Sequence, residues 1–398
     1  MTDYKVIIVG GGASGLLNLV ELVSGNNALK PSEVLLLEAN DRVGKKLVAT
    51  GNGQGNFSNA FVSENRYHGD EAFISTYVKL FNQVNLDEYF LRLGIPFCEG
   101  EDGKKYPLSK QANSALDVIR MFLESKGCNI KTGEKVIDAK VNGKNFVVKT
   151  QNQTYISSKL VLAFGGKAGK QFGTDGTSYH LAQNFSHFLT EQYPSLVQLK
   201  TPLDRIKGLK GLKENVIISA FDGDKFLSRA KGELLFTEYG ISGSAVFSVS
   251  SYLTDKKSPN VKIEFLPGFS EDDVAKLLKE RQKLAYINGQ DLLIGLINKK
   301  IGQALCKNLT NPTAENLAKL VKNFRIKITG NLGFNYAQVT KGGVKTNEIN
   351  PNSMESKLQK GLYILGEALD IDGDCGGFNL AFAFTSGIIS AKHIKDNF

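Results

Sequence analysis

A glycine-rich turn between two apolar segments near the N-terminus constrains the fold of this chain more than any other feature. The apolar run Val6–Val9 leads into a Gly-x-Gly-x-x-Gly motif at 10–15, and a helical pattern follows at 16–23. A second apolar run, 34–37, ends at Glu38. Strand, glycines, helix, strand and acid, in this order, are the parts of a βαβ dinucleotide-binding unit. The sequence therefore predicts an α/β fold with a Rossmann-type domain at its start.

Each glycine of the motif has its own physical task. Gly10 permits a tight turn, Gly12 lets the backbone approach a pyrophosphate, and Gly15 lets the helix pack closely on the strand. The free N–H groups of the first helical turn then face the phosphates. Glu38, 23 residues after Gly15, is placed to accept hydrogen bonds from ribose hydroxyls. Its charge repels a 2′-phosphate, which disfavours NADP and leaves NAD and the ADP half of FAD as alternatives.

The size and composition of the chain indicate a globular protein of several domains. With 398 residues, 41% hydrophobic and 22% charged, roughly two or three domains are expected. No apolar run reaches the roughly 20 residues that span a bilayer, and the first strand starts too early for a signal peptide. Four scattered cysteines and four scattered histidines favour neither disulfides nor a metal site. We therefore expect a cytoplasmic protein without metal or membrane contact.

The net charge of +9 raises the question of a nucleic-acid partner. The basic residues are mostly lysines spread along the chain, and no basic stripe interleaved with aromatic residues is visible in the sequence. We expect a solvated surface and a small-molecule substrate, with an anionic partner as the minority interpretation and nucleic acid unlikely. The oligomeric state is left open.

A discontinuous organisation is predicted. A nucleotide-binding domain comprises 1–189 and 336–398, an inserted β domain comprises 190–268 and 325–335, and an inserted helical domain comprises 269–324. Local signals add a capping box at Ser114 and Asp117, a hairpin turn at Asn142-Gly143 and a helix N-cap at Ser270.

A second glycine-rich turn lies near the C-terminus. A strand at 362–365 ends at Gly366, and a helix begins near Asn379 after several glycines and acids. Two helix N-termini suited to anionic or dipolar groups, at opposite ends of the chain, favour a long cofactor and hence FAD over NAD. The dipole of the second helix would stabilise the reduced flavin.

Between the two turns in the sequence, 44–59 is rich in glycine and amide residues. We expect this segment to form neither helix nor strand and to wrap the cofactor with backbone N–H and amide groups.

These motifs together resemble the HI0933-like flavoproteins, a family of NAD(P)/FAD-dependent oxidoreductases with aminoacetone oxidase-like and bile-acid-reductase-like members. The resemblance covers nearly the whole chain and is carried by the segments 44–53, 232–243, 341–344 with 348–350, 354–357 and 366–380. It implies non-covalent FAD and the architecture of the two-dinucleotide-binding-domain flavoproteins: a Rossmann-type domain, a β-barrel-like insertion and a small helical domain.

The resemblance also implies which residues surround the cofactor. The ADP part is held by Gly10, Gly12, Ala13, Ser14, Gly15, Glu38 and Ala39. The cofactor is further flanked by Lys45, Lys46, Thr50, Gly51 and Asn52, with the backbone of Val136 at the adenine and Gly165 and Gly166 near the pyrophosphate. The ribityl chain and isoalloxazine are bordered by Gly366, Glu367, Asp374, Asn379 and Leu380. The chain departs from many relatives at Gln54-Gly55, Phe164 and Asp374.

The implied activity is hydride transfer between FAD and a small organic substrate. The sequence lacks a second Gly-x-Gly-x-x-Gly motif after a strand, so NAD(P)H could serve only as a transient reductant of an enone reductase. Two alternatives are an amine oxidase that uses O2 and an RNA-modifying flavoprotein. No catalytic residue is assigned: His180 and His187 are expected to be structurally satisfied histidines, and Cys375 a small packing residue.

Overall fold

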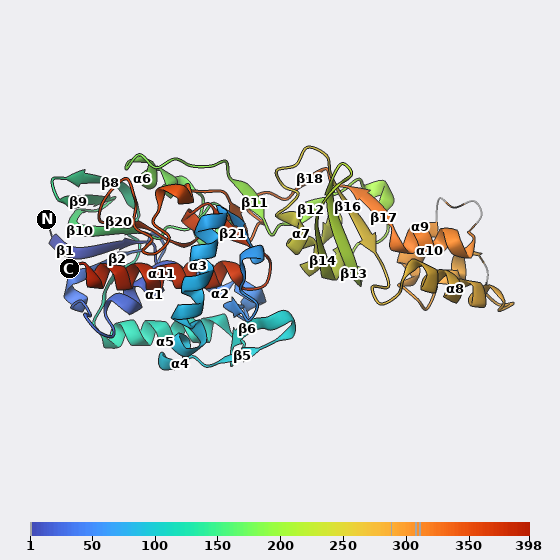
Figure 1. Ribbon diagram of the computed structural model, residues 1–398, viewed down its shortest axis with the longest axis horizontal. Coiled ribbons are helices and arrows are strands. Elements are labelled where there is room, and N and C mark those ends of the chain that lie inside the picture. Colours follow the sequence, from blue (N-terminus) through green and yellow to red (C-terminus); the bar gives the residue numbers. More distant parts are fainter. Residues whose placement is uncertain (1, 288, 307–308, 310–311) are drawn as a thin grey trace. The chain divides into compact units, whose positions relative to one another are not determined.

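The computed structural model describes residues 2–287, 289–306, 309 and 312–398. The chain divides into two compact units (Figure 1). The first contains Met1–Gln192 and Val339–Phe398, and the second contains Tyr193–Gln338. The helical segment predicted as a separate domain shares one hydrophobic core with the strands of the second unit. The three-domain boundaries stay a prediction beside this two-unit division.

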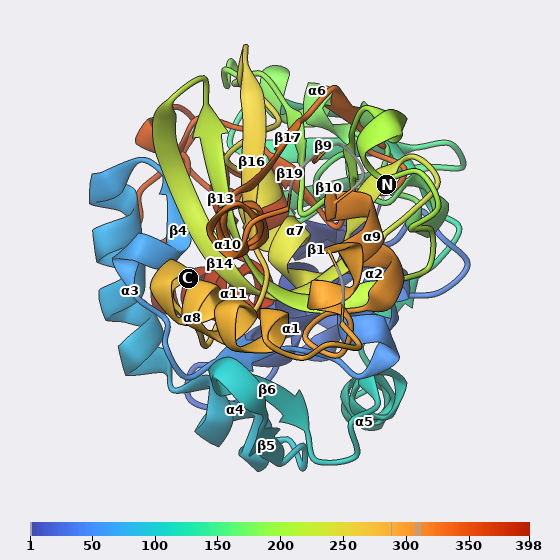
Figure 2. The same cartoon turned by 90° about the vertical axis from the view of Figure 1, so that its right-hand side faces the viewer.

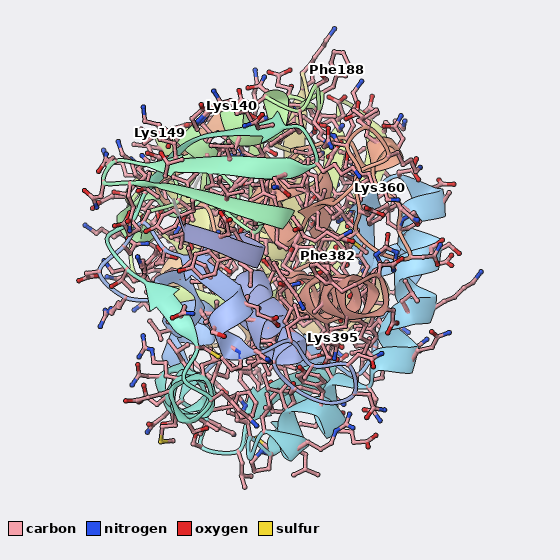
Figure 3. All side chains as sticks on the ribbon, turned by 90° about the vertical axis from the view of Figure 1, so that its left-hand side faces the viewer. Lys140, Lys149, Phe188, Lys360, Phe382 and Lys395 are labelled. Atoms are coloured by element: carbon pink, nitrogen blue, oxygen red, sulfur yellow. The ribbon has the colours of Figure 1, made fainter. Side chains whose placement is uncertain are left out.

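The first unit is built on a seven-stranded sheet whose parallel part has the Rossmann order. Its parallel neighbours, in spatial order, are β7 (Asn129–Lys131), β2 (Val34–Leu37), β1 (Thr2–Val9), β10 (Thr154–Leu162) and β20 (Leu362–Ile364). The first half of β10 pairs instead with an antiparallel hairpin of β9 (Asn145–Thr150) and β8 (Val136–Asn142), which Lys140 and Lys149 mark in Figure 3. The predicted turn at Asn142-Gly143 is confirmed, because Asn142 pairs with Asn145.

Apolar runs become strands here because both faces of the parallel sheet are covered. Val6–Val9 and Val34–Leu37 are all buried, as expected for strands between helical layers. The helices and helical turns of this unit are α1 (Ala13–Leu22), α2 (Lys45–Val48), α3 (Glu71–Val84), α4 (Leu86–Arg92), α5 (Ala112–Ser125), α6 (His180–Gln183) and α11 (Phe378–Asp396). Its shorter strands are β3 (Ser58–Asn59), β4 (Tyr67–Gly69), β5 (Phe97–Glu99), β6 (Lys104–Pro107), β19 (Val339–Lys341) and β21 (Ile371–Gly373).

Helices α1 and α11 lie side by side although they are near opposite ends of the chain in sequence (Figure 1). A Cβ atom on Gly387 would lie 2.4 Å from the carbonyl oxygen of Ser14, so only glycine permits this approach. The amide of Asn18 donates hydrogen bonds to the Gly387 carbonyl and the Ser390 hydroxyl. The C-terminal helix is thereby packed against the first helix of the βαβ unit.

The predicted capping box at Ser114 is wrong. Helix α5 already begins at Ala112 with Gln111 as its N-cap, so Ser114 lies inside the first turn. Its hydroxyl donates to the Gln111 side chain, and Asp117 accepts from Arg120. The helix therefore starts three residues earlier than the cap signal indicates, nearly one full turn, and Ala112 is buried at this start.

The second unit contains a seven-stranded sheet that curls strongly. In spatial order its strands are β17 (Phe324–Lys327), β16 (Pro259–Glu264), β13 (Lys213–Asp222), β14 (Lys225–Phe236), β15 (Gly240–Ser242), β12 (Leu199–Lys200) and β18 (Gly330–Asn331). Figure 2 shows β13 and β14 as two long neighbouring strands. The end strands β17 and β18 are separated by only two residues of chain, so the sheet must curve until its ends approach each other, as in a barrel. A short strand, β11 (Tyr193–Ser195), precedes it.

In the described part of this unit, the sheet is accompanied by the helices α7 (Ser244–Ser250), α8 (Glu271–Gln282), α9 (Lys299–Cys306) and α10 (Ala314–Lys322). The predicted N-cap is confirmed, because Ser270 and Asp273 form a capping box at the start of α8. Among the residues that the structure describes, no helix has the length and apolar character needed to cross a membrane.

Candidate functional site

The first glycine turn has the geometry that its motif predicts. Gly10 has a φ of 108°, and a Cβ atom there would lie 2.4 Å from the carbonyl oxygen of Ala163. A Cβ atom on Gly15 would lie 1.9 Å from the carbonyl oxygen of Gly10. At Gly12, by contrast, a Cβ atom would meet nothing within 4 Å. The loop is therefore closely packed at Gly10 and Gly15, and open at Gly12, where helix α1 begins without a side-chain cap.

Glu38 directly follows β2 and holds this turn in place through hydrogen bonds. One carboxylate oxygen accepts from the Gly11 N–H at 2.7 Å, and the other accepts from the backbone and side-chain nitrogens of Asn40, both at 2.7 Å. An ionised carboxylate offers about four acceptor positions, so room for one more donor remains. The backbone N–H of Glu134, two residues before the predicted contact at Val136, donates to the Glu38 carbonyl. Ala39 is exposed next to Glu38, whereas Val136 itself is buried.

The amide-rich segment after β2 is partly helical, which corrects the prediction that it forms no regular structure. Lys45 and Lys46 lie in the short helix α2, since the glycine at position 44 adopts the left-handed conformation and permits an abrupt helix start. The following residues Thr50–Gly53 form a 3₁₀ turn in which Gly51 and Asn52 have positive φ. Strand β3 then covers Ser58–Asn59.

Side chains from this segment reach the C-terminal turn. The ammonium of Lys46 forms an ion pair with the Glu367 carboxylate at 2.6 Å. The other oxygen of Glu367 accepts from the Thr340 N–H at 2.9 Å. Lys45 pairs instead with Asp41, and the Thr50 hydroxyl donates to the Leu47 carbonyl. Residues 321 positions apart in sequence are thus brought into direct contact.

The Gly165-Gly166 step after β10 lies against the same carboxylate. A Cβ atom on Gly166 would lie 2.6 Å from a Glu367 oxygen and 2.4 Å from the Thr340 hydroxyl. That hydroxyl accepts from the N–H groups of Lys167 and Ala168. Thr340 therefore organises the turn after Gly165. No local sequence pattern reveals this contact, because Thr340 lies far away in sequence.

The C-terminal turn meets the N-terminal one at Gly366. This glycine has a φ of 60°, and a Cβ atom on it would lie 2.9 Å from the Ser14 hydroxyl. Its N–H donates to the hydroxyl of Ser386 on α11, a residue that is not among those predicted for the site. The two glycine turns predicted at opposite ends of one cofactor site are therefore adjacent in the first unit.

The residues at the start of α11 shape the last part of this turn. The Asn379 side chain accepts from the Gly373 N–H and donates to the Gly373 carbonyl. Gly377 precedes the helix with a φ of 100°, and no side chain caps the helix there. Leu380 is half-buried in the first turn. The N-terminus of α11 therefore carries no side-chain cap, and the Asn379 side chain binds the backbone of Gly373.

Asp374 is bound by two basic side chains, Arg66 and His68, that no local sequence pattern marks. His68 approaches one oxygen at 3.2 Å, and Arg66 approaches the other at 3.3 Å. Both come from β4 and the turn before it, which reach Asp374 because β4 pairs with β21. Burial opposes the charged form of His68, but its hydrogen bond to Asp374 and the charges of Asp372 and Asp374 outweigh burial and nearby Lys341, and raise the pKa of His68. The histidines considered from the sequence have other partners: His187 contacts Glu348 and Ser356, and His180 contacts two backbone carbonyls.

The raised pKa of His68 predicts a pH-dependent contribution to stability. A histidine whose pKa is higher in the folded state stabilises the fold fully below its unfolded value of about 6.5, and this contribution is lost as the pH rises through the folded value. We expect His68→Gln to lower the free energy of unfolding more at about pH 5.5 than at about pH 8.5. Urea unfolding at both pH values measures the difference. His180→Gln is the matched control, and an equal loss for His68→Gln at both pH values would contradict the prediction.

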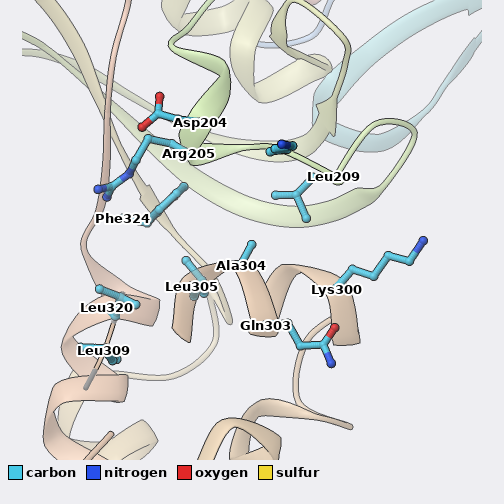
Figure 4. Close-up of a pocket in the computed structure, with 12 residues that line it drawn as sticks. Asp204, Arg205, Leu209, Lys300, Gln303, Ala304, Leu305, Leu309, Leu320 and Phe324 are labelled. Carbon is cyan, nitrogen blue, oxygen red and sulfur yellow. The ribbon is translucent and has the colours of Figure 1, made fainter. Parts of the chain in front are cut away.

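A separate cavity of about 420 Å³ lies within the second unit (Figure 4). Its floor is apolar and includes Leu209, Leu305 and Phe324, and Arg205 lies over the Phe324 ring at 5.4 Å. None of the residues predicted for the cofactor lines this cavity.

The βαβ unit, its glycine turn and the adjoining C-terminal turn define a Rossmann-type dinucleotide-binding domain. The chain belongs to the HI0933-like family: the model of the HI0933-like protein Rossmann domain matches residues 4–393. This confirms the resemblance and the fold class expected from the sequence.

Two curated relatives match over nearly their whole length. A 3-dehydro-bile acid delta(4,6)-reductase from Clostridium scindens is 33% identical, with 98% of each chain covered. A ribosomal RNA dihydrouridine synthase from Escherichia coli K12 is 26% identical, with 99% of this chain and 98% of the relative covered. The solved 3-ketosteroid-delta4-(5alpha)-dehydrogenase from Rhodococcus jostii RHA1 has the same fold, with a TM-score of 0.51, 14% identity, and coverage of 98% of this chain and 97% of that one. The protein is accordingly an oxidoreductase with a Rossmann-type FAD-binding domain.

Proposed function

We propose that this protein is a flavin-dependent reductase that saturates a carbon–carbon double bond conjugated with a carbonyl group. The observation that carries the proposal is the 33% identity, over 98% of both chains, to a reductase of 3-dehydro-bile acids. The name of the more distant relative, a dihydrouridine synthase, also denotes saturation of a double bond conjugated with a ring carbonyl. Both relatives are thus named for one class of reaction on very different molecules.

The residues of the first unit fit FAD. The open space at Gly12 suits a pyrophosphate that approaches the α1 N-terminus, while the packed positions Gly10 and Gly15 shape the turn. Glu38 keeps an acceptor position for a ribose hydroxyl, as proposed from the sequence. The contact between Ser14 and Gly366 brings the second turn to where an extended cofactor continues. When bound, the flavin supplies the hydride for the reaction.

The side chains around the C-terminal glycine turn fix the shape and the charge of that turn. The Lys46–Glu367 ion pair closes the turn against helix α2. Asn379 holds the backbone at Gly373, and no side chain caps the N-terminus of α11. The dipole of this helix end would stabilise negative charge on a flavin bound beside it. His68, with its raised pKa, adds a protonatable group on Asp374. These contacts support a site that favours an electron-rich reduced state.

An anaerobic reductant screen tests the proposal. The purified holoprotein is expected to be yellow, to bleach with NADPH or NADH, and to be reoxidised by a conjugated enone in the absence of oxygen. Bleaching only by amines, with peroxide formed in air, would instead support the amine oxidase alternative. A colourless protein that cannot be reconstituted with FAD would contradict both.

The distribution of charge favours a second candidate function, reduction of uridine in RNA. The second unit holds 22 lysine and arginine residues against 14 acidic ones, a net charge of +8, whereas the first unit holds 27 against 26, a net charge of +1. A concentrated positive charge is the electrostatic mark of an RNA-binding region. Nucleoside mass spectrometry of ribosomal RNA incubated with enzyme and reductant tests this candidate by the formation of dihydrouridine.

A further inference from the structure

One face of the curled sheet in the second unit is apolar and buried. Val216 and Ile218 of β13 point to this face with Val261 and Ile263 of β16. Helix α7 packs on the same side, because a Cβ atom on Gly232, the partner of Val216, would lie 2.6 Å from the Ser244 hydroxyl. Side chains alternate between the faces of a strand, so the residues in between point outward.

Strand register places cations side by side on this outer face. One cross-strand row runs from Arg325 on β17 through Lys262 and Ser219 to Arg229 on β14. The next row towards one end of the strands contains Lys327, Asn260, Phe221 and Phe226, and the row towards the other end contains Glu264, Ile217 and Lys231. We define the outer face by these three rows.

The single acid of the outer face is already compensated. Glu264 is 8% exposed, and its carboxylate pairs with Arg229 at 3.1 Å and with Lys262 at 3.0 Å. Lys231, Arg325 and Lys327 are exposed around this group. With five cations and one acid, the outer face presents a net positive charge of four to solvent.

Aromatic rings lie between these cations. The Arg325 guanidinium sits 4.9 Å from the ring centroid of Phe221, and the rings of Phe221 and Phe226 are 5.8 Å apart. Phe226 is 55% exposed, an unusual position for a phenylalanine on a sheet surface. The sequence shows no basic stripe interleaved with aromatic residues, because each strand contributes only one to three of these side chains and pairing alone assembles them.

We infer that the outer face binds single-stranded RNA. Cations that follow a phosphate backbone and exposed rings on which bases stack are the two elements of single-strand recognition on a sheet surface. A duplex keeps its bases stacked inside and offers nothing for Phe226 to stack on. Binding of a single-stranded nucleic acid is argued from the outer face alone. The choice of RNA over single-stranded DNA rests on the second candidate function.

Fluorescence anisotropy of the full-length holoprotein with labelled single-stranded oligouridine tests the inference at several salt concentrations. The double variant Arg325→Glu/Lys327→Glu is expected to bind at least about tenfold more weakly, with a salt dependence shallower by about 1.4 in log–log slope for two lost phosphate contacts. Phe226→Ala is expected to bind about fivefold or more weakly with an unchanged salt slope.

The matched control is Lys140→Glu/Lys149→Glu, which makes the same charge change on the exposed β8–β9 hairpin of the other unit. It is expected to retain most of the RNA affinity. Arg325→Gln/Lys327→Gln replaces the reversal variant if circular dichroism shows misfolding. Equal losses for control and outer-face variants, or tighter binding of duplex RNA or of anionic vesicles than of the single strand, would overturn the inference. Enone-dependent reoxidation of the flavin is measured in parallel and is expected to be the same in all variants.

Discussion

Replacing Gly12 with alanine is expected to leave the fold intact and to weaken FAD binding at least about tenfold, a loss of about 1.4 kcal/mol. A Cβ atom at Gly12 meets nothing within 4 Å, and the backbone there is extended, so alanine fits the protein itself. The methyl group would instead occupy the space through which a pyrophosphate approaches the backbone. Titration of the apoprotein with FAD measures the affinity, and thermal unfolding of the apoprotein verifies the fold.

Gly15→Ala is the informative counterpart, because the same added methyl group would clash with the backbone of the protein itself. Its Cβ atom would lie 1.9 Å from the Gly10 carbonyl oxygen, a backbone atom that cannot rotate away. We expect destabilisation beyond about 4 kcal/mol, which few single substitutions reach. If the Gly12→Ala protein binds FAD as tightly as the unmodified chain, the assignment of Gly12 to the cofactor site is wrong.

Replacing Lys395 with methionine is expected to cost about 3–5 kcal/mol of the free energy of unfolding. Lys395, labelled in Figure 3, lies on α11 and forms an ion pair with Glu21 of α1 at 2.8 Å. Its ammonium also donates to the Ser24 carbonyl at 2.9 Å. Both charged side chains are buried, so loss of the lysine would leave the Glu21 carboxylate without compensation. Urea unfolding of the apoprotein measures the loss.

Two further variants distinguish the loss of the Lys395–Glu21 ion pair from the general effect of replacing a lysine with methionine. Lys392→Met changes an exposed lysine of the same helix and is expected to alter stability by no more than about 0.5 kcal/mol. The double variant Glu21→Gln/Lys395→Met removes the stranded charge and is expected to recover part of the loss. If Lys395→Met and Lys392→Met are equally stable, the buried ion pair does not hold α11 to α1.

Much of the first unit follows from local patterns. The close packing at Gly10 and Gly15 and the open space at Gly12 follow from the motif, since a fixed loop geometry accompanies it. Apolar runs without alternation predict the buried strands β1 and β2, and the start of α8 follows from its capping residues. At Ser114 the same type of signal fails, because the burial of Ala112 decides where α5 begins.

The contacts that complete the candidate site could not be predicted in this way. His68 belongs to no recognisable sequence motif, and only the pairing of β4 with β21 brings it to Asp374. Thr340 and Ser386 likewise act on turns far away along the chain. No periodicity encodes such pairs, because their distance depends on how the chain closes and not on their spacing.

Local sequence patterns were sufficient to predict the Rossmann unit and its family, because a βαβ unit is local and its glycines are required by steric contacts that are fixed by the motif. Which distant residues meet follows only from the folded chain. It joins Lys46 to Glu367 and the first glycine turn to the last. It also gathers isolated cations and phenylalanines of four strands on one outer face, because strand register, and not sequence order, determines the neighbours of a side chain on a sheet.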